Sequence, residues 1–114
     1  MIIENMKTAS LTDGLIYRDG RPAITVLLQT KTSKEIRIAI KKGQEMKEHK
    51  APFPIVVEIF EGAIDFGIHG ERTSLKKGDL LTLDENMPHN LIGIEDSIVR
   101  LSLFQKDTVE RVQN

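Results

Sequence analysis

The 114-residue sequence predicts an all-β domain, either a sandwich or a barrel. Short apolar segments, several of them rich in β-branched residues, recur at intervals of roughly eight to twelve residues, which is the spacing of strands in such folds. Turn residues separate these segments, and no long segment has the 3.6-residue apolar period of a helix. We expect one domain, with a core in about residues 15–105, an N-terminal arm over 1–14 and a C-terminal tail over 106–114.

The first clear strand is expected within Pro22–Gln29, where the run Ile24–Leu28 is apolar on both of its faces. A strand of this kind needs a cover on each side. In a small barrel one of the covers is often a second subunit, and an uncovered edge would invite aggregation. We therefore predict a homodimer.

The later strands are marked by alternation and by the turns that end them. Lys34–Lys41 places Ile36, Ile38 and Ile40 on one face of a strand and Glu35, Arg37 and Ala39 on the other. Turns are expected at His69–Gly70 and at 76–79. Further strands are expected over 55–61, 63–69, 80–83 and 97–104, with a turn or short helix over 8–11 and one helical turn after Asp107.

Composition excludes several classes of protein. The chain has 16 basic and 17 acidic residues, and this balance argues against a nucleic-acid binder held by phosphate contacts. It has no cysteine, which excludes disulfides, thiolate metal sites and a cysteine nucleophile. No apolar stretch approaches ~18 residues, so no membrane-spanning helix is expected. The N-terminus does not read as a secretory signal, and we expect a cytoplasmic protein.

Two glycine-led segments each carry one histidine, and the spacing of the first resembles a motif of the cupin family. In that segment Gly43, His49 and Gly62 stand where the motif has its first glycine, first histidine and last glycine. Ala51 takes the place of its second histidine, and Ile55 takes the place of its glutamate.

The second glycine-led segment matches fewer positions of the second cupin motif. Gly78 and His89 fit its spacing, whereas Asp84, Asn86 and Gly93 replace its usual proline, glycine and asparagine.

A closer similarity is to one group of small single-domain cupins, which carry His-x-Ala-Pro in the first motif and Pro-His in the second. This chain has His49-Lys50-Ala51-Pro52 and Pro88-His89. The resemblance covers roughly residues 15–105 and implies a double-stranded β-helix, the jelly-roll barrel of the cupins. Because cupins include isomerases, dioxygenases, storage proteins and sensor domains, it implies the fold more strongly than an activity.

The resemblance also implies where a metal would bind. In the family two histidines, a glutamate and a third histidine converge on a metal inside the barrel, and here only His49 and His89 remain. Strand alternation turns the nearby carboxylates, Glu48 and Glu58, away from the interior. One interpretation is a pocket without a metal; the other is a divalent Fe, Mn, Ni or Zn ion with an incomplete set of protein ligands.

An apolar pocket with one or two imidazoles is typical of a small-molecule site, in which apolar contact gives affinity and polar groups fix orientation. The opposite interpretation is that these side chains only fill a small barrel, that Phe53 is a structural plug and that the methionines pack the core. His69 falls in a turn, and no role is expected for it. The candidate ligand-binding residues are Met46, His49, Phe53, Ile55, Val57, Met87 and His89.

Three functions compete on these observations. The first is a non-catalytic cupin that binds a small molecule; the second is a metal-dependent enzyme, similar to a dioxygenase or an isomerase, that uses His49 and His89; the third is a structural homodimer module. The sequence contains neither a glycine-rich phosphate loop nor a Gly-x-Ser-x-Gly nucleophile motif.

Overall fold

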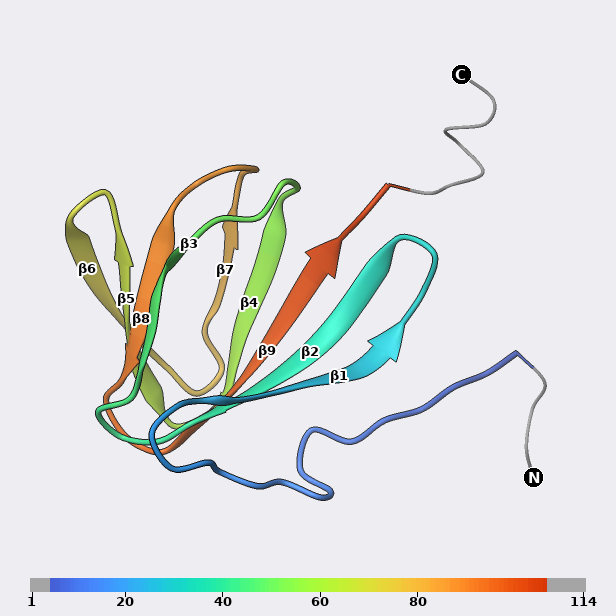
Figure 1. The fold of residues 1–114 in the computed structure, drawn as a ribbon, viewed down its shortest axis with the longest axis horizontal. Coiled ribbons are helices and arrows are strands. Elements are labelled where there is room, and N and C mark those ends of the chain that lie inside the picture. Colours follow the sequence, from blue (N-terminus) through green and yellow to red (C-terminus); the bar gives the residue numbers. More distant parts are fainter. Residues whose placement is uncertain (1–4, 107–114) are drawn as a thin grey trace.

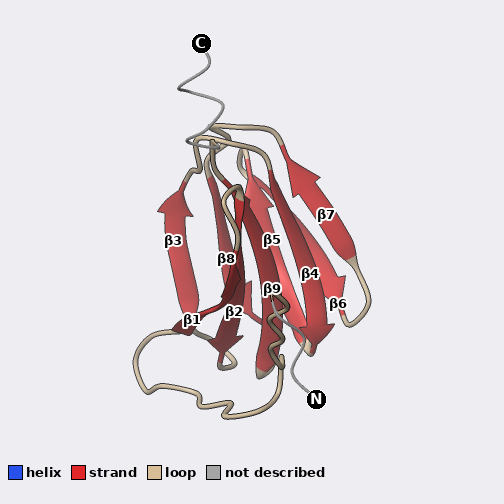
Figure 2. Cartoon of the chain, turned by 90° about the vertical axis from the view of Figure 1, so that its right-hand side faces the viewer, coloured by secondary structure: helices blue, strands red, loops and turns tan. Residues whose placement is uncertain are grey.

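The computed structural model describes residues 5–106, which form two antiparallel β-sheets that pack face to face (Figures 1 and 2). Within these residues no helix is long and apolar enough to cross a membrane. The five-stranded sheet has the order β1 (Ala23–Gln29), β2 (Ser33–Ile40), β9 (Ser97–Phe104), β4 (Ile55–Glu61) and β7 (Leu80–Leu83). The four-stranded sheet has the order β3 (Glu45–His49), β8 (His89–Gly93), β5 (Ala63–Ile68) and β6 (Glu71–Lys76).

The strand pairing is nested around one turn. Strand β5 pairs with β6, β4 with β7, β3 with β8 and β2 with β9, all antiparallel. The chain is thus one long hairpin rolled into two sheets, and its tip is His69–Gly70, where both residues have positive φ (52° and 78°). This pairing is the jelly-roll arrangement, so the predicted all-β double-stranded β-helix is confirmed.

The core lies between the two sheets. The predicted inner row of β2 is confirmed, because Ile36, Ile38 and Ile40 are buried. On the neighbouring strand β9, Val99 lies opposite Ile38 and is fully buried. The other core residues are Ile55, Val57 and Ile59 from β4, Ile64 and Phe66 from β5, and Leu91 from β8.

The outer face of β2 is more buried than its alternation predicts. Arg37 is only 7% exposed, because the N-terminal arm passes over it. The Arg37 Nη1 atom donates a hydrogen bond to the carbonyl of Asp13 at 2.9 Å, and the guanidinium lies 3.5 Å from three further carbonyls of the arm. The same arm has a turn rather than a helix after Ser10, whose hydroxyl accepts hydrogen bonds from the backbone at 12 and 13.

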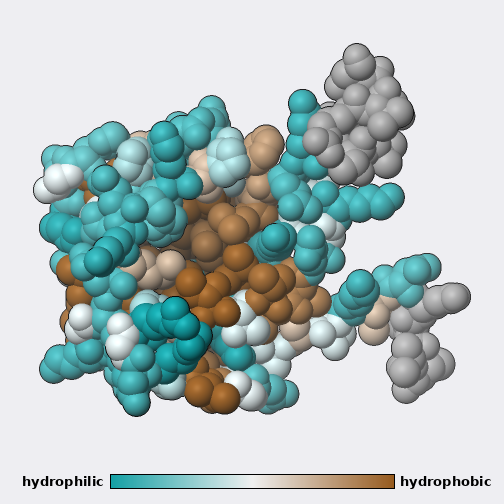
Figure 3. All heavy atoms as spheres, viewed as in Figure 1, coloured by the Kyte–Doolittle hydropathy of each residue, from teal (hydrophilic) through white to brown (hydrophobic). Residues whose placement is uncertain are grey.

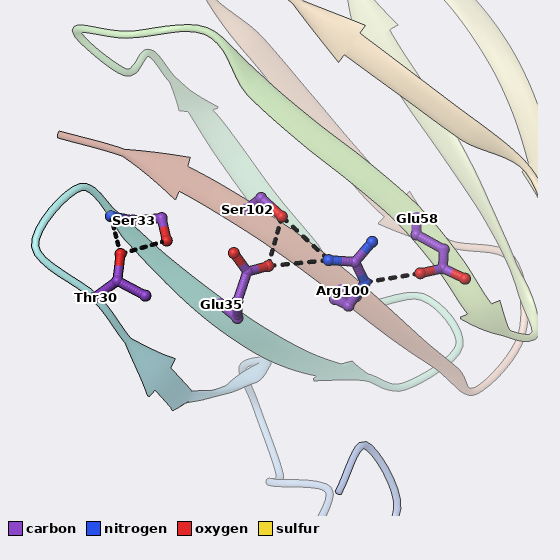
Figure 4. A network of polar contacts seen from close by, with 6 residues as sticks. All are labelled: Thr30, Ser33, Glu35, Glu58, Arg100 and Ser102. Carbon is purple, nitrogen blue, oxygen red and sulfur yellow. Dashed lines mark hydrogen bonds and ion pairs between the residues drawn. The ribbon is translucent and has the colours of Figure 1, made fainter. Parts of the chain in front are cut away.

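A charged network holds the outer face of the five-stranded sheet together (Figure 4). Arg100 lies between two carboxylates, with 2.9 Å from its Nη1 to Glu35 Oε1 and 2.7 Å from its Nε to Glu58 Oε1. The Ser102 hydroxyl also donates to Glu35 Oε1. Glu58 therefore points away from the interior, as its position in the strand predicts.

Strand β1 is an edge strand that the described residues leave largely uncovered. Ile24 lies opposite Ile38 and Val26 opposite Ile36, so both are on the core side of the sheet. They are nevertheless 57% and 50% exposed, because β1 pairs only with β2. Within residues 5–106 the predicted cover is missing at Ile24 and Val26, whereas Leu27 and Leu28 are half-buried near the N-terminal arm. The helical turn expected after Asp107 lies outside the described residues.

Candidate functional site

The two histidines of the glycine-led segments lie side by side. Strand β3 pairs with β8 so that His49 is directly opposite His89, and the ring centroids are 4.3 Å apart at an interplanar angle of 61°. His89 is 5% exposed and stacks on Phe66, with 5.6 Å between the ring centroids. His49 is exposed, because β3 is the edge strand of its sheet.

Backbone hydrogen bonds orient both imidazoles in the same way. The Nδ1 atom of His49 lies 2.8 Å from the carbonyl oxygen of Lys47, and that of His89 lies 2.9 Å from the carbonyl oxygen of Met87. A carbonyl can only accept, so Nδ1 carries the proton in each ring. In the neutral form each Nε2 is then an acceptor and cannot donate.

Burial keeps the inner imidazole neutral. Desolvation is the largest influence and lowers the pKa of His89 below its ordinary value. The hydrogen bond to the Met87 carbonyl opposes this effect, and the neighbouring His49 adds to it. His89 is therefore an uncharged polar group in an apolar setting at neutral pH.

This pKa shift predicts a pH-dependent stability. As the pH falls below about 6.5, His89 becomes protonated in the unfolded chain while it is still neutral in the native protein. The free energy of unfolding therefore decreases with decreasing pH, until the pH is below the lowered pKa of the native state. One such group changes the free energy of unfolding by at most about 1.4 kcal/mol per pH unit. Urea unfolding of the wild type and of His89→Gln between pH 5 and 8 measures the effect. Identical pH profiles of the two proteins would contradict it.

A groove opens where the strands β2 and β9 face the loop after β3. Its volume is about 450 Å³. Figure 3 shows apolar atoms gathered on this side of the molecule, in front of β9, β2 and β1, with hydrophilic atoms around them. The apolar lining comes mainly from Ile24, Ile36, Ile38, Met46, Ala51, Pro52, Phe53, Leu101, Leu103 and Phe104, and the polar lining from Lys34, His49, Lys50 and Gln105.

Behind the groove the barrel interior is filled. A cavity of only about 10 Å³ lies among His49, His89, Val57, Phe66 and their neighbours, which is too small to hold more than a single water. Side chains of Ile38, Met46, His49 and Leu101 border both spaces. Space for a ligand therefore lies on the outer side of His49, and His89 lines the small inner cavity behind it.

The structure divides the predicted site residues into three groups. Met46, His49 and Phe53 line the groove, whereas Val57 and His89 line the small inner cavity. Ile55 is buried in the core, and Met87 is half-buried and lines neither space, although its carbonyl orients His89. His69 is exposed at the hairpin tip.

Sequence reasoning missed the two lysines of the groove. Lys34 stands two positions before Ile36, and the alternation of β2 extended by one step would have placed it on the inner face. Lys50 follows the motif histidine directly, and no sequence signal distinguishes it from a solvated residue.

The described residues do not fit a resident metal. Within residues 5–106 no group of three or more His, Asp or Glu side chains lies close enough to hold an ion. Glu58 is bound to Arg100 on the outer face, and Glu48 is exposed. Two imidazole nitrogens fall short of the three or four protein ligands of ordinary sites.

The fold has many counterparts of known structure, although the sequence matches no family model and no curated protein. An RmlC-like cupin from Desulfovibrio desulfuricans has a TM-score of 0.78 at 21% identity, over 85% of this chain and 94% of that chain. A conserved protein with a double-stranded β-helix domain from Klebsiella pneumoniae has a TM-score of 0.78 at 20% identity, over 90% and 92%.

A third counterpart is a conserved protein of unknown function from Streptococcus pyogenes. Its TM-score is 0.76 at 23% identity, over 93% of each chain. The nested pairing, the two sheets and these structural matches together lead to one conclusion: this chain has the double-stranded β-helix fold of a small cupin domain.

Proposed function

We propose that this protein binds a small molecule in the groove, with His49 as a polar contact and His89 as the neutral support behind it. The observation that carries the proposal is the groove itself, whose volume of about 450 Å³ lies in the range of small-molecule sites. Its lining is largely apolar with a few polar side chains, and that combination gives affinity together with orientation.

A metal-dependent enzyme is the less favoured candidate. The two imidazoles lie edge to face, and the Nδ1 atom of each is bonded to a backbone carbonyl, so the pair offers an ion at most two nitrogen ligands, the Nε2 atoms. The carboxylate that would complete a metal site is replaced by Ile55, a buried core residue. Binding without chemistry needs only what the groove supplies.

Filling the groove tests the proposal. Ala51 lines it, so Ala51→Phe is expected to lower the affinity for the neutral apolar dye N-phenyl-1-naphthylamine at least about 10-fold. Ala9→Phe is the matched control, because Ala9 borders a different hollow on the outer face of the sheet. Fluorescence titration gives both affinities. Absence of dye binding by the wild type, or equal binding by wild type and Ala51→Phe, would refute the proposal.

We also propose that the protein is a homodimer that pairs through β1. Support comes from Ile24 and Val26, two large apolar side chains exposed on an edge strand. Light scattering should give twice the 12.9 kDa chain mass for the wild type and a single chain mass for Ile24→Glu/Val26→Glu. A single-chain mass for the wild type at micromolar concentration would contradict the dimer.

A further inference from the structure

The groove has a one-sided charge. Lys34 and Lys50 both line it, and among residues 5–106 no aspartate or glutamate does so. The chain as a whole carries 17 acidic residues against 16 basic ones, so this is a local departure from its overall balance. An apolar groove with only cationic charge at its wall is complementary to a ligand with an apolar body and a negative head.

Lys34 occupies a position where the fold would otherwise place an apolar residue. It lies opposite Leu103, in the same row as Ile36 opposite Leu101 and Ile38 opposite Val99. Its strand therefore directs it to the inner face, where it is half-buried beside the groove. A lysine stem can pack along such apolar side chains while its ammonium group stays at the mouth.

Within residues 5–106, the two lysines lack the carboxylate partner that three other lysines have. Lys41, Lys76 and Lys77 each pair with a carboxylate, at 2.8, 3.8 and 2.7 Å respectively. Among the ion pairs of residues 5–106, none involves Lys34 or Lys50. Within the described part of the chain, their ammonium groups are available to a ligand.

The neutral form of His49 cannot replace the lysines as a donor. Its Nδ1 proton is directed to the Lys47 carbonyl, so the Nε2 of the neutral ring can only accept a hydrogen bond. An anionic head has only acceptors to offer. The Gln105 amide in the lining already donates to the carbonyls of Thr30 and Lys31, so among the described lining residues the ammonium groups are the free cationic donors.

Resting on the proposed binding function, we infer that the ligand is an amphipathic carboxylate. Its apolar body lies against Ile36, Leu101 and Leu103, and its carboxylate is held by Lys34 and Lys50. The lysines determine the preference for an anion. The apolar wall contributes affinity that an uncharged analogue of the ligand would also have.

A matched pair of probes separates these two contributions. Decanoate and decanamide have the same chain and differ in the charge of the head. By isothermal titration calorimetry, we expect the wild type to bind decanoate about 3- to 10-fold more tightly than decanamide at low salt, with a smaller preference in 0.5 M NaCl.

Lys34→Met/Lys50→Met should bind the two probes with equal affinity. The control is Lys42→Met/Lys47→Met, which removes the same charge from exposed positions outside the groove and should keep the preference for decanoate.

The outcomes distinguish this inference from the function on which it rests. Equal binding of both probes by the wild type, with both weakened by Ala51→Phe, would overturn the anionic ligand and leave the binding groove in place. A preference that survives in Lys34→Met/Lys50→Met, or that is lost equally in the control, would overturn the role of the two lysines. Failure of both probes to bind the wild type would overturn the binding function and this inference together.

Discussion

Gly62→Ala is expected to lower the free energy of unfolding by about 2–5 kcal/mol. Gly62 has a φ of +87°, a conformation that costs a residue with a Cβ roughly 1–2 kcal/mol. A Cβ atom there would also lie 2.5 Å from the Asp96 carbonyl oxygen and 2.8 Å from Ser97 Cα, which are backbone atoms that cannot rotate away. Relief of this overlap needs a backbone shift, typically at a further cost of about 1–3 kcal/mol.

The position of Gly62 in the fold explains why so little adjustment is available. It separates Glu61, the last residue of β4, from Ala63, the first residue of β5, and is therefore the corner at which the chain passes between the sheets. Ser97 is fully buried beside this corner, and its hydroxyl bonds the backbone of Ala63 at 3.0 Å. A shift of the corner would break these bonds as well.

Urea unfolding of Gly62→Ala and Gly20→Ala measures the contribution of crowding. Gly20 has nearly the same φ, +82°, but a Cβ there would meet nothing within 4 Å. Its substitution should cost only the conformational strain of roughly 1–2 kcal/mol. Equal losses in the two variants would show that the backbone contacts at Gly62 are not limiting.

Much of the strand pattern could be predicted from the sequence, and the exceptions are strands without a hydrophobic period. The strands with clear apolar signals were predicted, among them β1, β2, β4 and β9. Strands β3 (EMKEH) and β6 (ERTSLK) were not, because most of their side chains are polar and exposed and carry no hydrophobic period. Strand β8 (HNLIG) was not predicted either, because it is short and its two large apolar residues, Leu91 and Ile92, are adjacent and show no alternation. These strands form because the antiparallel pairing that begins at the 69–70 turn continues along the chain and includes them.

The same pairing explains how the candidate site could be predicted only in part. His49 and His89 lie roughly equally far on either side of the hairpin tip, so they meet once that turn is known. The groove depends on tertiary structure, since Phe53 comes from a loop and Leu103 from the last strand. Nearness in sequence to a site residue was a poor guide for Met87, whose side chain lines neither space.

Arg100→Met is expected to lower the free energy of unfolding by about 1–3 kcal/mol, because it leaves two partly buried carboxylates without a cation. Removing one partner from a fully buried ion pair costs about 3–5 kcal/mol. The expected loss here is smaller, since the side chains of Arg100, Glu35 and Glu58 are 31%, 26% and 29% exposed. The hydrogen bond to Glu58 is the main influence that raises the pKa of Arg100, so the guanidinium is charged throughout the working pH range.

The contribution of the two unpaired carboxylates is measured by comparison with Glu35→Gln/Glu58→Gln/Arg100→Met, in which neutral amides replace them. We expect this triple variant to recover more than half of the stability lost in Arg100→Met, as measured by urea unfolding at pH 7. If both variants were equally unstable, packing of the arginine stem rather than charge would hold the sheet.

The network also affects the groove, because Arg100 and Ser102 alternate along β9 with Leu101 and Leu103, which form the wall of the groove. By linking β2, β9 and β4 on the outer face, the ion pairs fix the strand whose inner face the ligand would contact.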